Sequence, residues 1–266
     1  MGENEAHVSD RRGFPRLLWG MVAHPRDTLK YLNERAKPLW WLPALLAVLM
    51  AVLPVVAAAP LTAEQAREAV LVSQERIAEQ QGTELSEEQR AQMEGMVASP
   101  LLIVVFPAIG AIVGLVIGWL TWSGSLYLAG MVFGGRSTFG ALFRTVVWTW
   151  LPYALRGLLQ TGYILGTGQL ITNPGLSGLV SQGPSVEEMF AAPPSLGQLA
   201  LSSFLARIDL FLLWRLALMV VGVVVVMRLG RRKAIAIVLG IWLLLTGLGL
   251  LPTVVGGLFS GVVAGI

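Results

Sequence analysis

The sequence predicts an all-α fold: a polytopic transmembrane helix bundle with five spans, a cytoplasmic N-terminus and a C-terminus outside. Composition is the first observation, because 55% of the 266 residues are hydrophobic and only 13% are charged, against roughly 25% charged in ordinary globular proteins. The second is a series of apolar runs long enough to cross a bilayer. The third is that the segments between these runs alternate between basic and acidic or nearly neutral.

The first 38 residues are polar and basic, and they include a short amphipathic pattern. Its apolar residues recur at the spacing of one helix face. With arginines around it, this helix is predicted to lie at the membrane interface as an anchor. Docking of a cytoplasmic partner and sensing of anionic lipid are the alternatives. The face consists of Phe14, Leu17, Leu18, Met21 and Val22.

Residues 39–60 form the first predicted span, with an uncharged run long enough to cross the hydrocarbon core. Its alanine-rich end resembles a signal cleavage site, but 38 preceding residues are too long for a signal peptide, so we expect a retained span. The acidic segment 61–99 follows, either as two short helices in water or as helical extensions of the flanking spans. It is expected to bind an external partner or simply to present a solvated face. Capping boxes are predicted at Thr62/Gln65 and Ser86/Gln89.

The second predicted span, residues 100–134, is uncharged and longer than one crossing requires. Gly110, Gly114 and Gly118 recur every four residues on one of its faces. Such a stripe of small residues allows close approach of another helix. We expect packing inside the bundle, with oligomerisation as the alternative.

The remaining chain alternates three further spans with short or polar connections. A cytoplasmic turn precedes the third span, a Gly/Pro/Ser-rich external loop precedes the fourth, and a basic turn precedes the fifth. A capping box at Ser195/Gln198 is predicted to open the fourth span. In order, the segments are 135–140 (turn), 141–165 (third span), 166–196 (loop), 197–227 (fourth span), 228–233 (basic turn) and 234–266 (fifth span).

Charge assigns the sides of the membrane. The N-terminal segment and the turns near Arg136 and at 228–233 are basic, whereas 61–99 and 166–196 are acidic or nearly neutral. Basic connections remain in the cytoplasm. This alternation agrees with five crossings. No repeat relates the two halves, so an inverted-repeat transporter is not supported.

Charged residues inside the predicted spans are the candidate functional cluster: Arg156 in the third, and Arg207, Asp209 and Arg215 in the fourth. A charge within a bilayer is costly and usually faces a partner inside the bundle. Asp209 and Arg215 are six residues apart, about 240° around a helix, so Arg156 is the predicted partner of Asp209. We expect an interhelical clamp, with Arg207 reaching the outer interface. A polar pathway or partner-binding site is the alternative.

The sequence contains no recognisable catalytic or cofactor signature. Walker, GxSxG and HExxH patterns are absent. There is no cysteine, and both histidines lie in the N-terminal segment, which excludes a histidine or cysteine metal site inside the membrane. We therefore predict no catalytic residue, no metal, no cofactor and no enzymatic activity. The net charge of +3 comes from topology-setting blocks and does not indicate nucleic acid binding.

Several short pieces occur in order along the five predicted spans: 21–29 (MVAHPRDTL), 134–139 (GGRSTF), Pro152-Tyr153, 209–214 (DLFLLW) with Gly222, and 231–234 (RRKA). In this order they resemble the bacterial Yip1-domain family of membrane proteins. The resemblance implies an all-helical bundle without an enzymatic site. Eukaryotic relatives are similar to membrane-traffic factors that contact small GTPases, and some bacterial relatives resemble accessory partners of ABC-type export systems.

These observations favour a non-enzymatic accessory or scaffold protein in a bacterial cell membrane, with an ABC-type export system as its most concrete partner. Its expected contacts are membrane lipids and other membrane proteins or further copies of itself. A small transporter using Arg156, Asp209 and Arg215 along a polar path is the second hypothesis. A membrane-shaping, trafficking-like factor acting through the interfacial helix is the third.

Overall fold

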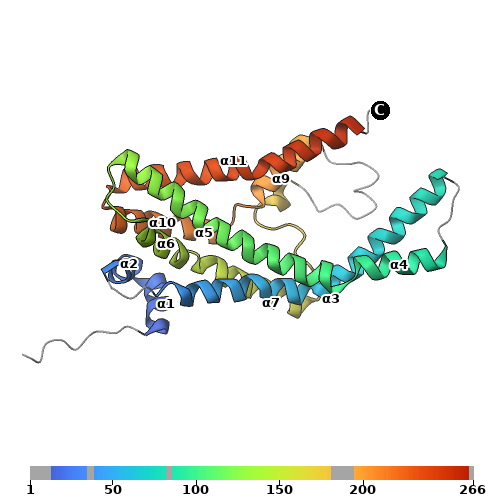
Figure 1. The fold of residues 1–266 in the computed structure, drawn as a ribbon, viewed down its shortest axis with the longest axis horizontal. Coiled ribbons are helices and arrows are strands. Elements are labelled where there is room, and N and C mark those ends of the chain that lie inside the picture. Colours follow the sequence, from blue (N-terminus) through green and yellow to red (C-terminus); the bar gives the residue numbers. More distant parts are fainter. Residues whose placement is uncertain (1–12, 35–38, 82–85, 181–194, 264–266) are drawn as a thin grey trace, which may run out of the picture.

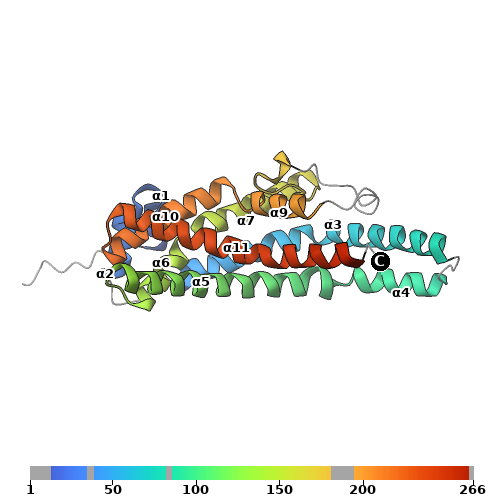
Figure 2. The same ribbon diagram turned by 90° about the horizontal axis from the view of Figure 1, so that it is seen from above.

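The computed structural model describes residues 13–34, 39–81, 86–180 and 195–263, and these ranges contain helices and connections but no strand. The helices form an elongated bundle (Figures 1 and 2). Four helical stretches in the described part are long and apolar enough to cross a membrane: Trp41–Gln74, Ala91–Phe133, Leu210–Met227 and Arg231–Pro252. The all-helical membrane architecture predicted from composition is therefore confirmed.

One end of the bundle gathers the basic parts of the chain. The short helices α1 (Phe14–Ala23) and α2 (Pro25–Glu34) lie there, together with the turns that follow α5 (Phe106–Phe133) and α10 (Leu210–Met227) (Figures 1 and 2). The two turns touch, because the backbone N–H of Arg136 donates to the carbonyl of Met227 at 3.3 Å.

The first apolar run continues without a break into the acidic segment. Helix α3 extends over Trp41–Gln81 and includes Pro60. Thr62 does not form the predicted capping box, because its hydroxyl donates to the carbonyl of Ala58 within the same helix at 3.0 Å. This geometry belongs to a helix interior. Of the two forms predicted for the segment, helical extension of a span is the one observed.

Helix α4 (Glu87–Val97) returns beside the end of α3 and leads into α5 through η1 (Leu101–Val105), a π-helical turn. It begins with the predicted capping box, in which Ser86 accepts from the N–H of Gln89 and the Gln89 side chain accepts from Ser86. At 1.5 Å per residue, α3 is about 60 Å long, twice the hydrocarbon thickness. The α3–α4 pair therefore projects beyond the bundle as a hairpin (Figure 2).

The third predicted span, 141–165, is two helices instead of one. Helix α6 (Phe139–Trp148) ends before α7 (Leu151–Thr167) begins. Pro152 explains the difference, because proline lacks the N–H and its ring clashes with the carbonyl four residues earlier. That carbonyl belongs to Trp148, the last residue of α6.

The fourth predicted span, 197–227, is also divided. Helix α9 (Leu196–Leu205) opens with the predicted Ser195/Gln198 capping box. A short link follows, and α10 starts at Leu210. Asp209 causes this restart, since its carboxylate accepts from the N–H of Leu212 at 2.7 Å and aspartate is a preferred N-cap residue. Helix α11 (Arg231–Val263) then returns along the bundle.

The amphipathic N-terminal helix packs against protein, which differs from the predicted interfacial anchor. Leu17 and Met21 are fully buried in a cluster with Trp148, with Phe14 and Leu18 packed around them. Val22 alone of the predicted face is exposed. Burying an apolar side chain is worth about 1.5–3 kcal/mol whether lipid or protein covers it, so the same pattern suits both locations.

The core lies between α5, α6, α10 and α11 around Leu126, Leu142, Met219 and Val223, all fully buried. Helices α3 and α7 approach closely at Gly157, where an added Cβ would collide with the carbonyl oxygen of Met50. A glycine is required there because the two backbones are in contact. This contact holds α7, and the charge it carries, beside α3.

Candidate functional site

Arg156 and Asp209, predicted as partners, form an ion pair between α7 and the start of α10. One Nη of Arg156 lies 3.0 Å from a carboxylate oxygen of Asp209, and their side chains are 26% and 14% exposed. The other oxygen of Asp209 caps α10. One carboxylate thus starts a helix and joins it to another.

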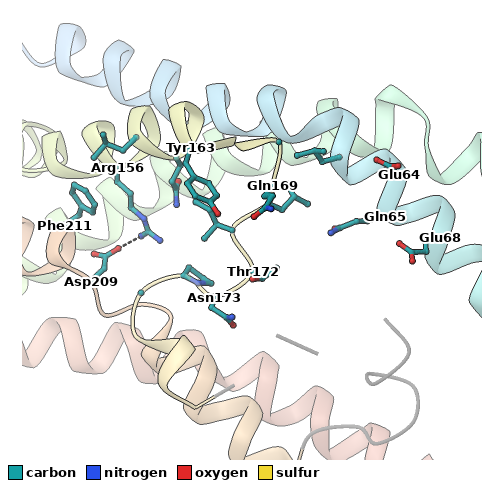
Figure 3. Close-up of a pocket in the computed structure, with 18 residues that line it drawn as sticks. Glu64, Gln65, Glu68, Arg156, Tyr163, Gln169, Thr172, Asn173, Asp209 and Phe211 are labelled. Atoms are coloured by element: carbon teal, nitrogen blue, oxygen red, sulfur yellow. Dashed lines mark ion pairs between the residues drawn. The ribbon is translucent and has the colours of Figure 1, made fainter. Parts of the chain in front are cut away.

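This ion pair lies in the wall of a pocket of about 910 Å³. Figure 3 shows the pocket between the second half of α3, α7, the loop after α7 and the start of α10, with Arg156 and Asp209 linked at one side and Glu64 and Glu68 at the other. Its polar lining also includes Gln65, Gln160, Tyr163, Gln169, Thr172 and Asn173.

Backbone hydrogen bonds hold the loop that closes this pocket. Gly175 adopts a left-handed conformation at φ +61°, and an added Cβ would meet backbone carbonyls of the α9–α10 link. The next N–H, of Leu176, donates to the carbonyls of Leu205 at 3.0 Å and Ile208 at 3.1 Å. A 3₁₀ turn, η2 (Ser177–Leu179), follows. The loop is therefore anchored to the link that carries Asp209.

The chemistry of the pocket suits hydrogen bonding of a polar solute. Amide and hydroxyl groups dominate, and the carboxylates of Glu64 and Glu68 outnumber the one arginine, which Asp209 already pairs. The lining set contains no serine, cysteine, histidine or lysine, and its ionisable side chains are Glu64, Glu68, Arg156, Tyr163 and Asp209. No cluster of histidine, cysteine, aspartate or glutamate suited to a metal is found in the described part of the chain.

Arg215 lies apart from the ion pair, in an aromatic cage. It is 4% exposed, and its guanidinium carbon lies 3.6 Å from the ring centroid of Trp150, 4.7 Å from that of Trp122 and 5.2 Å from that of Tyr153. These distances fit cation–π contacts. Its Nε and one Nη are buried without a hydrogen bond from any described residue.

Arg207 makes a third, separate contact. It is exposed, as expected for a residue reaching an interface, and one Nη donates to the carbonyl of Gly249 in α11 at 2.7 Å. Pro252 lies in the same turn of α11 and lacks the N–H that would bond to the carbonyl of Leu248, the residue before Gly249. The four charges predicted as one group therefore separate into three arrangements. Arg156 and Asp209 form an ion pair, Arg215 lies in the aromatic cage, and Arg207 contacts α11.

The glycine stripe of α5 is only partly covered. An added Cβ at Gly118 would lie 3.2 Å from the Trp150 ring, so this glycine packs inside the bundle. Gly110 and Gly114 have nothing within 4 Å among the described residues and are exposed. Packing within one chain therefore accounts for one of the three glycines.

The pocket's amides and the aromatic cage around Arg215 are not marked by any pattern in the sequence. The pocket residues come from α3, α7 and the following loop, and no spacing in the sequence links them. Trp122, Trp150 and Tyr153 fit an apolar pattern, so nothing marked them as partners of a cation. Tyr153, beside Pro152, was noted only as part of the family resemblance.

Comparison with known protein families gives one match: the Yip1 domain matches residues 19–251. The chain belongs to the Yip1 family. This match extends from α1 to Leu251 in α11 and includes the ion pair, the aromatic cage and the glycines of α5. No curated protein and no solved structure matches the chain significantly. The family resemblance predicted from the short motifs is confirmed.

Proposed function

We propose that this Yip1-family protein is a non-enzymatic accessory or scaffold subunit of a membrane complex. A bacterial cell membrane and an ABC-type export system are its most concrete setting, on the family resemblance. A scaffold needs surface that its own fold leaves uncovered. The first half of α5 supplies it, because little of the most apolar part of Ala91–Phe133 is buried, whereas Trp119, Trp122 and Leu126 in the second half of α5 pack in the core.

The uncovered Gly110 and Gly114 are the observation on which this proposal rests. Exposed residues of a span that faces only lipid have no need to be small, whereas glycines four residues apart let a partner helix approach closely. Their neighbours Ile109, Val113 and Ile117 are also exposed. A transmembrane helix of another subunit fits this face.

Substitution at Gly114 tests the proposal. An added Cβ at Gly114 meets no described atom within 4 Å, and this glycine is exposed, so we expect Gly114→Leu to retain the fold while displacing the partner helix. The control is Gly240→Leu in α11, which is equally open. We expect Gly114→Leu to lose detergent co-purification with export-system subunits and Gly240→Leu to keep it. Equal recovery of those subunits with both variants would contradict the proposal.

The proposed topology has five crossings, with the N-terminus inside and the C-terminus outside. Two observations support it. The basic segments gather at one end of the bundle (Figure 1), as the positive-inside rule requires. Helices α6 and α7 together supply a fifth, kinked crossing between the four long spans. In this topology the α3–α4 hairpin and the pocket lie outside the hydrocarbon core or at its outer boundary.

A small permease is the second candidate, and the pocket of about 910 Å³ at the Arg156–Asp209 pair favours it. Arg215, the third residue of the predicted path, does not line this pocket. Flux of polar solutes through liposomes containing only this protein, abolished by Asp209→Asn, would support the permease over the scaffold. The membrane-shaping hypothesis is the third candidate; of the apolar face of α1, Leu17 and Met21 are buried and Val22 is exposed.

A further inference from the structure

A second cavity, of about 190 Å³ and open on one side, lies where α5, α7, α10 and α11 meet. Two leucines and six other residues line it, and none of them is acidic. The surrounding charge is therefore positive, in contrast to the acidic pocket at the ion pair. The six residues are Trp122, Tyr153, Arg207, Arg215, Trp242 and Thr246.

Arg215 contributes to the wall of this cavity a positive charge whose hydrogen-bond donors are not all paired. Its side chain is buried, no described carboxylate pairs with it, and Nε and one Nη form no hydrogen bond. A buried cation without a counter-charge is strongly disfavoured. Arginine also cannot relieve this cost by losing its proton.

The aromatic cage meets this need only in part, because Tyr153 forms a side-chain hydrogen bond with Arg215 while Nε and one Nη have no acceptor. Cation–π contacts use the flat face of a guanidinium, whereas its five N–H donors point outward in the plane of the group. Trp150 lies 3.6 Å from the guanidinium carbon, the stacking distance. The stacked ring therefore orients Arg215, and two of its buried in-plane nitrogens, Nε and one Nη, lack an acceptor that a ligand accepting two hydrogen bonds would supply. A carboxylate or phosphate has this geometry.

We propose that this cavity binds an oxyanion, a carboxylate or a phosphate, held by Arg215 from within and by Arg207 at the exposed mouth. The volume corresponds to about six water molecules at roughly 30 Å³ each, enough for the anionic group and a few attached atoms. Trp122 and Trp242 form an apolar wall for the part of the ligand that carries no charge. Arg215 lies about 9 Å along α10 from Asp209, so the site is within reach of a lipid headgroup or a solute from the outer side.

Native mass spectrometry of the full-length protein in non-ionic detergent tests this proposal. Three probes are compared: short-chain phosphatidylglycerol, diacylglycerol of the same chain length, and inorganic phosphate. We expect binding of phosphatidylglycerol or phosphate, and none of the neutral diacylglycerol above background. Binding of the phospholipid alone assigns the site to a lipid headgroup, and binding of phosphate alone assigns it to a small solute.

Variants locate the binding. Arg215→Met should weaken it at least tenfold. Arg207→Gln, which removes the charge at the exposed mouth together with the bond to the carbonyl of Gly249, should weaken it severalfold. Arg228→Gln, at the opposite basic end of α10, is the matched control and should leave it unchanged. If Arg215→Met does not fold, anion binding by Arg207→Gln tests the proposal by itself: weaker binding supports it, and unchanged binding overturns it. Loss with Arg228→Gln but not with the cavity variants, or no binding of either anion, would overturn the proposal.

Discussion

Asp209 gives the sharpest test of the structure, because its two oxygens have different partners. One accepts the N–H of Leu212 at 2.7 Å, and the other pairs with Arg156 at 3.0 Å. Asp209→Asn keeps an acceptor for the cap and removes the charge. Asp209→Leu removes both contacts. The difference between the two variants therefore isolates the cap.

Magnitudes follow from burial. An N-cap is worth about 0.5–2 kcal/mol. Loss of one ion-pair partner costs about 0–1 kcal/mol at an exposed surface and about 3–5 kcal/mol in a buried site. With 26% and 14% exposure, the Arg156–Asp209 pair lies between these limits, at about 1–3 kcal/mol. We expect Asp209→Asn to lose that amount and Asp209→Leu to lose about 1 kcal/mol more.

Unfolding in detergent micelles, by denaturant or heat, measures these losses. A double-mutant cycle with Arg156→Gln gives the coupling energy directly. Coupling below about 0.3 kcal/mol would refute the ion pair, since independent sites add to within that error. Equal losses for the asparagine and leucine variants would refute the cap.

Two further predictions use matched positions on one helix and the same unfolding assay. Leu17→Ala should lower the free energy of unfolding by about 2–5 kcal/mol, because Leu17 is fully buried. Val22→Ala, at an exposed position of α1, should lower it by less than about 0.5 kcal/mol. Similar losses for the two variants would mean that α1 does not pack on the bundle. Gly157→Leu should prevent α3 and α7 from packing, because even a Cβ collides with the carbonyl of Met50. At Gly162, which is exposed, an added Cβ meets no described atom within 4 Å, so Gly162→Leu should fold normally. Normal folding of both glycine variants would contradict the α3–α7 contact.

Local chemistry made part of this structure predictable. The apolar runs, the Ser86 and Ser195 capping boxes and the Arg156–Asp209 pair all follow from the residues themselves or from the cost of charge in a membrane. Pro152 contained the information for the α6–α7 break. Hydropathy is continuous across both breaks and therefore predicts a single span in each place. The proline at 152 and the N-cap aspartate at 209 instead divide these spans into two helices each.

Other features depend on contacts that no sequence pattern encodes. The apolar face of α1 has the same spacing whether it meets lipid or Trp148, so periodicity could not distinguish the two. The cage around Arg215 brings together Trp122 on α5 and Trp150 before α7. A tryptophan in an apolar helix ordinarily packs against other apolar side chains, so its contact with a cation could not be predicted. The pocket beside Asp209 exists only because a loop after α7 folds back onto the α9–α10 link.

Single-cysteine accessibility tests the central claim, a five-span bundle in a membrane, most directly. The chain contains no cysteine, so each variant carries one label site. With a membrane-impermeant maleimide on intact cells, we expect Gln92→Cys and Gln169→Cys to react, and Asn33→Cys and Ser137→Cys to react only after permeabilisation. Ser137 and Gln169 flank the α6–α7 crossing. Labelling of both from the same side would remove that crossing and contradict the five-span account.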